Sequence, residues 1–127
     1  MDSKKVLTVF LEAWAAKDWN LMYINCQKTW CEGHKVSGLK SLFSSKDVPG
    51  ARELKEFQII SFTNSGNVRA DYVIECVYGD GSIKTHSAII ICESAPYSPA
   101  TYGDWGVNPI SIIRVVDEIK APVKKGK

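Results

Sequence analysis

The chain has 127 residues, of which 45% are hydrophobic, 24% charged and 10% aromatic. This length and balance are typical of one globular domain and exclude two independent ones. Sixteen basic against fourteen acidic side chains give a formal net charge of +2, which without a basic stripe does not indicate nucleic-acid binding. The longest apolar runs, at residues 6–11 and 88–92, fall far short of the roughly 20 residues that cross a membrane.

The amino terminus is interpreted as a helix and not as a secretory signal. Lys4, Lys5 and the small-x-small stretch at residues 13–15 imitate such a signal, but Glu12 places a charge beside the end of a short apolar core. The protein is therefore predicted to be cytoplasmic. Four cysteines lack the dense spacing of a secreted mini-domain and are expected to be free thiols: Cys26, Cys31, Cys76 and Cys92.

Three helices are predicted in the first third of the chain, over residues 4–16, 18–33 and 35–45. Ser3 is expected to cap the first helix, whose apolar residues recur at helical spacing. A break at Lys17 and a second cap at Asp18 then open the next helix, which Gly33 ends.

From Leu54 onward the hydrophobic period changes to two, which predicts an antiparallel sheet. Strands are expected over residues 57–64, 67–78, 83–93 and 110–119. Ser65-Gly66 and Asp80-Gly81 have the length and composition of two-residue hairpin turns. Residues 94–106 are expected to form a long loop. Residues 1–120 then make a single domain, and residues 121–127 a flexible basic tail.

Two-residue turns would fix the register of the sheet and place Phe62 opposite Arg69. The helix-covered face then carries an almost wholly apolar set: Phe57, Ile59, Tyr72, Ile74, Cys76, Tyr78, Ile83, Ile89 and Ile91. The other face mixes charges with a second apolar set: Ile60, Phe62, Val73, Val77 and Ile90. Because a soluble monomer rarely leaves such a patch in water, we predict a homodimer through this outer sheet face. The same register places Cys76 and Cys92 on opposite faces, so no disulfide is expected between them.

Three helices followed by a hairpin-linked antiparallel sheet is the element order of cone-shaped α+β domains similar to nuclear transport factor 2. The segment at residues 10–22, FLEAWAAKDWNLM, resembles that superfamily's first helix, its break before Asp18 and the start of its second helix. The resemblance spans roughly residues 4–119. It implies an α+β fold with N-terminal helices packed on a curved antiparallel sheet, the cystatin-like or nuclear transport factor 2-like cone, which encloses a pocket. The superfamily includes polyketide cyclases, dehydratases and ketosteroid isomerases, as well as members that only bind or dimerise.

The resemblance allows isomerase chemistry to be tested position by position. Where the ketosteroid isomerase branch carries a tyrosine donor, this chain has Phe10, which has no hydroxyl to offer an oxyanion. The branch's aspartate base falls near residues 32–34, where Glu32 or His34 is available for proton transfer. Its strand-borne acid falls near residues 88–89, where no acid exists. Steroid-type isomerisation is therefore not expected, and Glu32 and His34 are the only catalytic candidates.

Two further groupings have structural interpretations. Cys26, Cys31 and His34 give C-x4-C-x2-H, which lacks the fourth ligand of a zinc site. Cys26 is interpreted as a small buried thiol, and neither a metal nor a cofactor is expected. Glu75 facing His86 imitates a catalytic dyad, but no nucleophile accompanies it, so it is interpreted as a cross-strand pair.

A pocket is predicted between the first two helices and the inner sheet face, lined by Trp14, Trp30 and Tyr72 and open near Glu32 and His34. An apolar lining with a polar rim indicates a small hydrophobic ligand with one polar group. We therefore expect a small-ligand-binding or protein-interaction module without demonstrable catalysis, and no nucleic-acid or membrane partner. Two alternatives stay open. One is a pocket enzyme of the cyclase, dehydratase or isomerase kind that uses Glu32 or His34, and the other is a purely structural subunit, which a filled cavity would favour.

Overall fold

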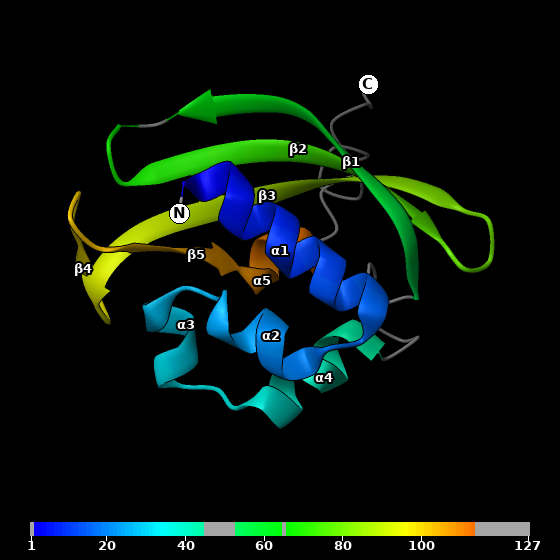
Figure 1. Cartoon of the computed structure of the whole chain (residues 1–127), viewed down its shortest axis with the longest axis horizontal. Helices are drawn as coiled ribbons and strands as arrows, with labels where there is room; N and C mark the ends of the chain where they lie inside the picture. Colours follow the sequence, from blue (N-terminus) through cyan, green and yellow to red (C-terminus); the bar gives the residue numbers. More distant parts are fainter. Residues whose placement is uncertain (1, 45–52, 65, 114–127) are drawn as a thin grey trace, which may run out of the picture.

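The computed structural model describes residues 2–44, 53–64 and 66–113 (Figure 1). The helices are α1 (Ser3–Ala16), α2 (Trp19–Ile24), α3 (Lys28–Glu32), α4 (Val36–Ser44) and α5 (Pro109–Ile113). The strands are β1 (Leu54–Asn64), β2 (Arg69–Tyr78), β3 (Ile83–Ala95), β4 (Ser98–Pro99) and β5 (Asp104–Asn108). They form one antiparallel sheet in the order β1-β2-β3, with β4 and β5 both paired to β3. Figure 1 shows α1 lying along the curved sheet, with α2, α3 and α4 gathered beyond it. The predicted α+β class is confirmed.

The first helix begins one residue earlier than the sequence predicts. The Asp2 carboxylate accepts a hydrogen bond of 2.8 Å from the Lys5 amide and so caps α1. Ser3, the predicted cap, is instead the first residue of α1 and is buried. Its hydroxyl shares a hydrogen bond of 2.7 Å with the Tyr72 hydroxyl, which ties the start of the helix to the sheet.

The predicted break between the first two helices is confirmed. Lys17 adopts the left-handed conformation with φ of 59°, and its N–H donates to the Ala13 and Trp14 carbonyls. The Asp18 carboxylate then accepts from the Leu21 amide at 3.2 Å and caps α2.

The second predicted helix is divided in two by a contact with β5. Residues 25–27 leave the helical path and run beside the strand. The Val107 amide donates to the Asn25 carbonyl at 2.7 Å, and the Gln27 amide donates to the Val107 carbonyl at 2.9 Å. Cys26 and Val107 form a parallel bridge. Because residues 25–27 give their backbone groups to the sheet, α2 ends at Ile24 and α3 begins at Lys28.

The second hairpin is longer than predicted. Its loop has three residues, Gly79-Asp80-Gly81, and not two. The Gly81 amide donates to the Tyr78 carbonyl, and the Tyr78 amide donates to the Ser82 carbonyl, both at 2.9 Å. Gly81 has a φ of +87°, the left-handed conformation that closes three-residue hairpins.

This extra loop residue shifts the register of β3 by one position. Glu75 pairs with Thr85, while His86 pairs with Ile74 and shares a hydrogen bond of 2.6 Å with the Tyr78 hydroxyl. The predicted Glu75–His86 pair is therefore wrong. The shift also exchanges the two faces of β3. The buried residues are Ala88, Ile90 and Cys92, and the predicted inward residues Ile83, Ile89 and Ile91 are partly or largely exposed.

The first hairpin also differs from its predicted register. Asn64 pairs with Ala70, so the connection is longer than two residues, and Phe62 lies opposite Tyr72 instead of Arg69. A β-bulge at residue 60 shifts the pairing again along β1. Phe62 therefore shares the face of Tyr72, and the rings lie 4.9 Å apart.

Cys76 and Cys92 point to the same face of the sheet, so the prediction that they lie on opposite faces is wrong. Cys76 is buried with its neighbours Ile74 and Tyr78, and Cys92 is buried in phase with the inward residues of β3. Cys76 pairs with Lys84, which precedes Cys92 by eight positions. At about 3.3 Å per residue this separation exceeds 20 Å, and a disulfide between them is geometrically impossible.

The C-terminal region of the domain differs most from prediction. The predicted loop at residues 94–106 contains the end of β3, all of β4 and the start of β5. Residues 110–113, where the predicted last strand at residues 110–119 would begin, belong instead to α5. The Asn108 side chain accepts from the Ile110 amide at 3.0 Å, and Pro109 is the first helical residue, where its missing N–H costs nothing. Residues 114–119 and the predicted tail at 121–127 lie outside the described residues.

The core lies between the helices and one face of the sheet. Alternate residues of β2 point into it, and Trp14 of α1 is only 1% exposed. The Trp14 ring lies 4.8 Å from Phe43 of α4 and 6.0 Å from Tyr78 of β2. Truncating such a buried ring costs about 3–5 kcal/mol. Other fully buried side chains are Phe10, Leu7, Leu11, Met22, Leu39, Leu54, Ile74, Ile90 and Ile112.

The bridge to β5 predicts that Gly106→Ala is strongly destabilising. A Cβ atom at Gly106 would lie 2.4 Å from the Gln27 Cα, so β5 would have to move away and lose its bonds to residues 25–27. We expect a loss of about 2–4 kcal/mol in the free energy of unfolding, measured by urea denaturation. Gly38→Ala in α4 is the control, since nothing lies within 4 Å of its Cβ position. It should stabilise by about 0.5–1 kcal/mol. Equal stability of Gly106→Ala and wild type would contradict the bridge.

Candidate functional site

The three predicted ligand residues lie in three different surroundings. Trp14 is enclosed by other core rings, as described above. Tyr72 is 4% exposed and bonds Ser3 through its hydroxyl. Trp30 is 6% exposed, and its ring lies 6.3 Å from Tyr23. Within the described chain, no ring contact joins Trp14, Trp30 and Tyr72 to one another.

The two catalytic candidates, Glu32 and His34, are both exposed. Glu32 is the last residue of α3. The His34 ring stacks on Trp30 with centroids 4.1 Å apart and planes 4° apart, and its Nδ1 lies 2.7 Å from the Trp30 carbonyl oxygen. The Tyr23 hydroxyl donates to the His34 carbonyl at 2.6 Å. His34 is thus held as a surface ring, and neither Glu32 nor His34 is part of the outer-face pocket described next.

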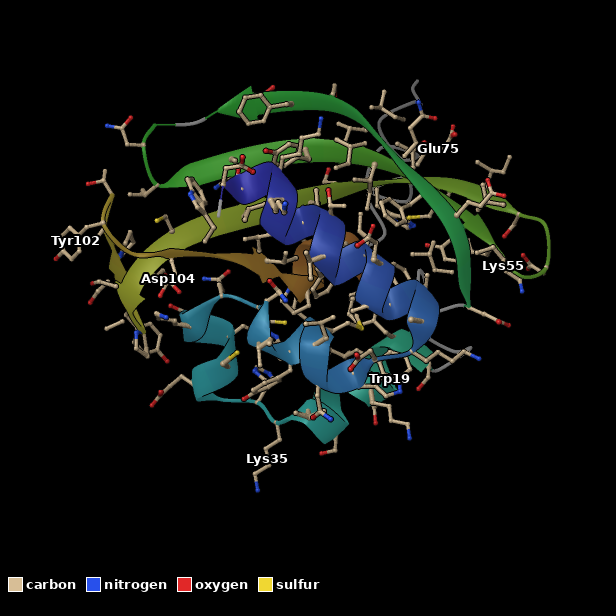
Figure 2. The ribbon with its side chains drawn as sticks, viewed as in Figure 1. Trp19, Lys35, Lys55, Glu75, Tyr102 and Asp104 are labelled. Carbon is tan, nitrogen blue, oxygen red and sulfur yellow. The ribbon has the colours of Figure 1, made fainter. Side chains whose placement is uncertain are left out.

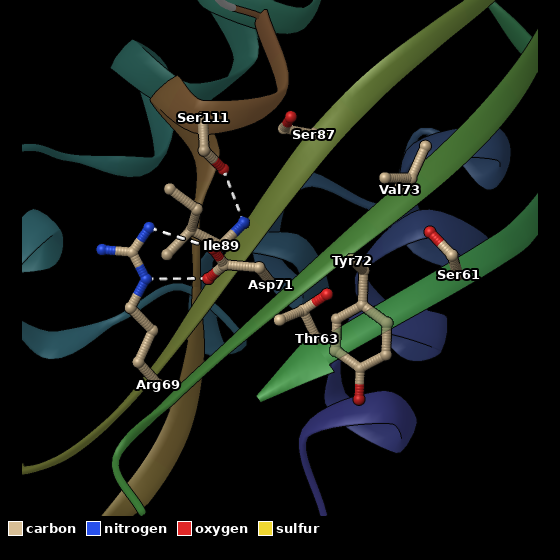
Figure 3. A pocket seen from close by; sticks show the side chains of 9 residues that line it. All are labelled: Ser61, Thr63, Arg69, Asp71, Tyr72, Val73, Ser87, Ile89 and Ser111. Carbon is tan, nitrogen blue, oxygen red and sulfur yellow. Dashed lines mark hydrogen bonds and ion pairs between the residues drawn. The ribbon is translucent and has the colours of Figure 1, made fainter. Parts of the chain in front are cut away.

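A pocket of about 370 Å³ lies instead on the face of the sheet opposite α1 (Figure 3). It crosses β1, β2 and β3, and α5 borders it. Its lining consists of Ser61, Thr63, Arg69, Asp71, Tyr72, Val73, Ser87, Ile89 and Ser111. Of the predicted site residues, Tyr72 belongs to this lining. The register explains the hydroxyl-rich composition, because Ser61 pairs with Val73 and Val73 pairs with Ser87 across three adjacent strands.

An ion pair stands at one side of the pocket. Arg69 Nε donates to Asp71 Oδ1 at 2.7 Å, and Arg69 Nη2 donates to Asp71 Oδ2 at 3.1 Å. Figure 3 shows the guanidinium meeting the carboxylate side by side. The hydrogen bonds to Asp71 raise the pKa of Arg69, so its guanidinium stays charged. Both side chains are partly exposed, and the pair therefore contributes little to stability and is free to meet a ligand.

The hydroxyl groups of the pocket fall into two kinds. Ser111 is fully engaged, since its Oγ accepts from the Ile89 amide at 2.9 Å and donates to the Asn108 carbonyl at 2.6 Å. The hydroxyls of three other lining residues form no hydrogen bond with any described residue: Ser61, Thr63 and Ser87. Three unengaged hydroxyls and an Arg–Asp pair give the pocket both donors and acceptors.

A buried carboxylate holds α3 against the end of β3. Glu93 is 2% exposed and accepts from the Thr29 amide at 3.0 Å, from the Gln27 side-chain amide at 3.3 Å and from the Thr29 hydroxyl. The Tyr97 amide donates to the Thr29 hydroxyl at 2.8 Å. No local pattern in the sequence signals this cluster, because Gln27 and Thr29 lie more than 60 positions before Glu93. Its role is structural, since its oxygens are occupied by the chain itself.

The cysteines of the C-x4-C-x2-H motif are brought together, but the histidine is not brought to them. Cys26 is 6% exposed, as expected of a buried thiol, and the Cys31 Sγ lies 3.9 Å from the Cys26 carbonyl oxygen. His34 faces Trp30 instead. In the described ranges no group of three or more His, Cys, Asp or Glu side chains is placed to hold a metal ion.

Aromatic residues near the end of β3 are surface features. Tyr97 is 72% exposed and Tyr102 is 84% exposed. Figure 2 shows Tyr102 at the margin of the molecule, with Asp104 nearby on β5. Asp104 forms an ion pair of 3.1 Å with Lys28.

Comparisons with known proteins give few matches. No family model matches the chain, and no curated protein matches it. Among solved structures, the chain is similar to the solution structure of a SEC-C motif containing protein from Rhodopseudomonas palustris. The TM-score is 0.48 at 12% identity, over 76% of this chain and 67% of that one. A likeness of this size supports no conclusion about family or function. Separately, none of the helices in the described part of the chain is long and apolar enough to cross a membrane.

The Glu93 cluster predicts that Glu93→Gln destabilises the protein by about 1–3 kcal/mol. The new amide group would turn an N–H₂ toward donors that now bond a carboxylate, leaving a buried donor unsatisfied. Asp104→Asn is the matched control, because it breaks an ion pair whose carboxylate is 84% exposed and should cost under about 1 kcal/mol. Urea denaturation measures both. A Glu93→Gln protein as stable as Asp104→Asn would refute the structural role of the carboxylate.

Proposed function

We propose that the protein is a small-ligand-binding module whose ligand occupies the pocket on the outer face of the sheet. The observation that carries this proposal is a concavity of about 370 Å³ in which three side-chain hydroxyls are unengaged by the described residues. This volume falls in the range of small-molecule sites. Unengaged hydroxyls beside a charged pair recognise a partner through directional hydrogen bonds, which is how such sites obtain specificity.

The lining indicates a different ligand from the small hydrophobic one that the sequence suggests. The hydroxyls and the Arg69–Asp71 pair match a neutral molecule carrying several hydroxyl groups. Val73 and Ile89 offer contact to an apolar ring face. We propose a polyol or monosaccharide-like ligand, bound without catalysis.

The alternatives to a binding module have less support. A pocket enzyme that uses Glu32 or His34 would need these groups aimed into a cavity, and both are exposed and do not line the outer-face pocket. A purely structural subunit is supported by the filling of the core around Phe10, Trp14 and Tyr72, which are 0–4% exposed. The outer pocket favours a ligand-binding function over a purely structural one.

We also propose membership of the nuclear transport factor 2-like superfamily and a cytoplasmic location. The superfamily proposal is supported by the order of N-terminal helices and curved antiparallel sheet, together with the confirmed break at Lys17 and cap at Asp18. Free thiols at all four cysteines support a reducing compartment.

A homodimer through the outer sheet face is a second proposal. The predicted outer patch does not form as a whole. Ile90 is 0% exposed, and Phe62 lies on the same face as Tyr72. A different apolar set points outward beside the pocket without lining it, namely Val77, Ile83 and Ile91. Ile83 is 60% exposed, and this observation favours a contact with a second copy.

The ligand proposal predicts binding of simple polyols at millimolar concentration. Glucose, myo-inositol and, for comparison, octanoate would be titrated into ¹⁵N-labelled protein. The polyols should shift the amide signals of Thr63, Ser87 and Ile89. Ser87→Val removes a lining hydroxyl and fills space, so it should weaken binding at least about fivefold. Thr85→Val makes a similar change on the same face outside the pocket and should leave binding unchanged.

Two results would count against the outer pocket. Absence of shifts at millimolar polyol would reject it outright. Octanoate-induced shifts centred on Trp14 and Trp30 would instead support the hydrophobic site predicted from the sequence.

The dimer proposal predicts that Val77→Asp yields a monomer. Burying an unpaired carboxylate in an interface costs several kcal/mol, and Val77 does not line the pocket. Lys40→Asp, at an exposed position of α4, introduces the same residue elsewhere and should stay dimeric. Sedimentation equilibrium at micromolar concentrations measures both. A monomeric wild type would reject the dimer.

A further inference from the structure

Two cysteines lie side by side where α2 gives way to α3. Cys26 belongs to the bridge beside β5, and Cys31 lies one helical turn into α3. The Cys26 Sγ lies 3.5 Å from the Met22 carbonyl oxygen, in the last turn of α2. The Cys31 Sγ also lies 3.9 Å from the Cys26 carbonyl oxygen and 3.6 Å from the Tyr23 carbonyl oxygen. The fold therefore places the Cys31 thiol against the Cys26 backbone, and both thiols contact carbonyl groups of the last turn of α2.

The two thiols differ in burial and in acidity. Cys26 is 6% exposed, and its hydrogen bond to Cys31, together with burial, raises its pKa. Cys31 is partly exposed, and its pKa is lowered to about 7, chiefly by the hydrogen bond from Cys26 and further by Tyr23 and Lys28. Burial and Glu93 oppose this change. Near neutral pH, Cys31 therefore has substantial thiolate character while Cys26 keeps its proton.

The remaining cysteines lack this combination. Cys76 is 0% exposed, and burial raises its pKa to about 12. Cys92 is 1% exposed, and burial raises its pKa also. A partly exposed, acidic thiol with a second cysteine nearby is the arrangement found in cysteines that oxidants attack first.

We propose that Cys31 is a site of oxidation by hydroperoxides and that Cys26 resolves it to an intramolecular disulfide. The Cys31 thiolate attacks one peroxide oxygen, so that an S–O bond forms and the O–O bond breaks. With hydrogen peroxide, the departing hydroxide takes up a proton and leaves as water. Cys26 then loses its proton and attacks the Cys31 sulfur, the S–S bond forms and the S–O bond breaks, and a second water leaves. Two thiols are oxidised and one peroxide is reduced.

Disulfide formation would alter the junction of α2 and α3. In a disulfide the sulfurs lie about 2 Å apart, so Cys26 gives up its contact with the Met22 carbonyl and Cys31 gives up its contact with the Tyr23 carbonyl. The adjacent stack of Trp30 on His34 belongs to the same short helix and its following loop. Oxidation therefore acts on the segment that joins the helices to β5.

Intact mass and peptide mapping test this proposal on the whole protein. Protein isolated under reduction should titrate four thiols. One equivalent of hydrogen peroxide at pH 7 should remove two of them, with a mass loss of about 2 Da and a linked peptide joining Cys26 to Cys31. Because thiolate is the attacking form, the rate should rise about tenfold from pH 6 to pH 8 and level off above.

Variants separate the two roles. In Cys26→Ser, oxidation should stop at a sulfenic acid on Cys31, which a dimedone probe traps. Cys31→Ser should react with peroxide far more slowly than wild type and should not be labelled by the probe. Cys76→Ser is the control and should form the disulfide as wild type does. If one of these buried substitutions unfolds the protein, the Cys26–Cys31 linked peptide from the oxidised wild-type protein is sufficient to test the proposal. Four remaining thiols, a link through Cys76 or Cys92, or a link between two molecules would overturn the proposal.

Discussion

The short bridge between residues 25–27 and Val107 determines how the helices meet the sheet. Its two backbone hydrogen bonds, of 2.7 and 2.9 Å, replace helical ones and end α2. Gly106 makes the approach possible, since any side chain there would meet the Gln27 backbone. Because the bridge fixes Gln27, the next residues begin α3 beside Glu93, and the buried carboxylate receives their donors. The helices are thus joined to the sheet by polar contacts at one end and by the Trp14 core at the other.

Local signals predicted the helical part of the fold well. The Lys17 break, the Asp18 cap and the end at Gly33 depend on residues within a few positions of one another, and the structure confirms each. The division of the second helix depends on β5, some 80 positions away, and no local pattern in residues 19–32 signals it. The apolar residues at 110–113 suit a strand or a helix equally, and the Asn-Pro sequence before them was the signal for the helix.

The candidate site was missed through a register error of one residue. A two-residue turn at Asp80-Gly81 predicts that Ile89 points inward and Ile90 outward, and with them an apolar patch on the outer face. Gly79 is the residue that indicates the longer loop, because Gly-Asp-Gly also suits a three-residue loop with Gly81 at positive φ. With the register corrected, Ser87 and Ile89 join Ser61, Thr63 and the Arg69–Asp71 pair on one surface. Tyr72 is the one predicted site residue in this lining, and its side chain lies on the inner face as predicted, with its hydroxyl bonded to Ser3.

In the proposed function, the inner face of the sheet therefore stabilises the fold and the outer face binds the ligand. The inner face is filled by side chains and carries the stability, whereas the outer face offers hydroxyls that no described residue engages. A crystal of the protein soaked with myo-inositol tests this division most directly. Density for the polyol should lie between Ser87, Thr63 and the Arg69–Asp71 pair, with hydrogen bonds to both hydroxyls. A crystal in which that surface stays empty at saturating myo-inositol, or in which the ligand lies among Trp14 and its neighbours, would contradict it.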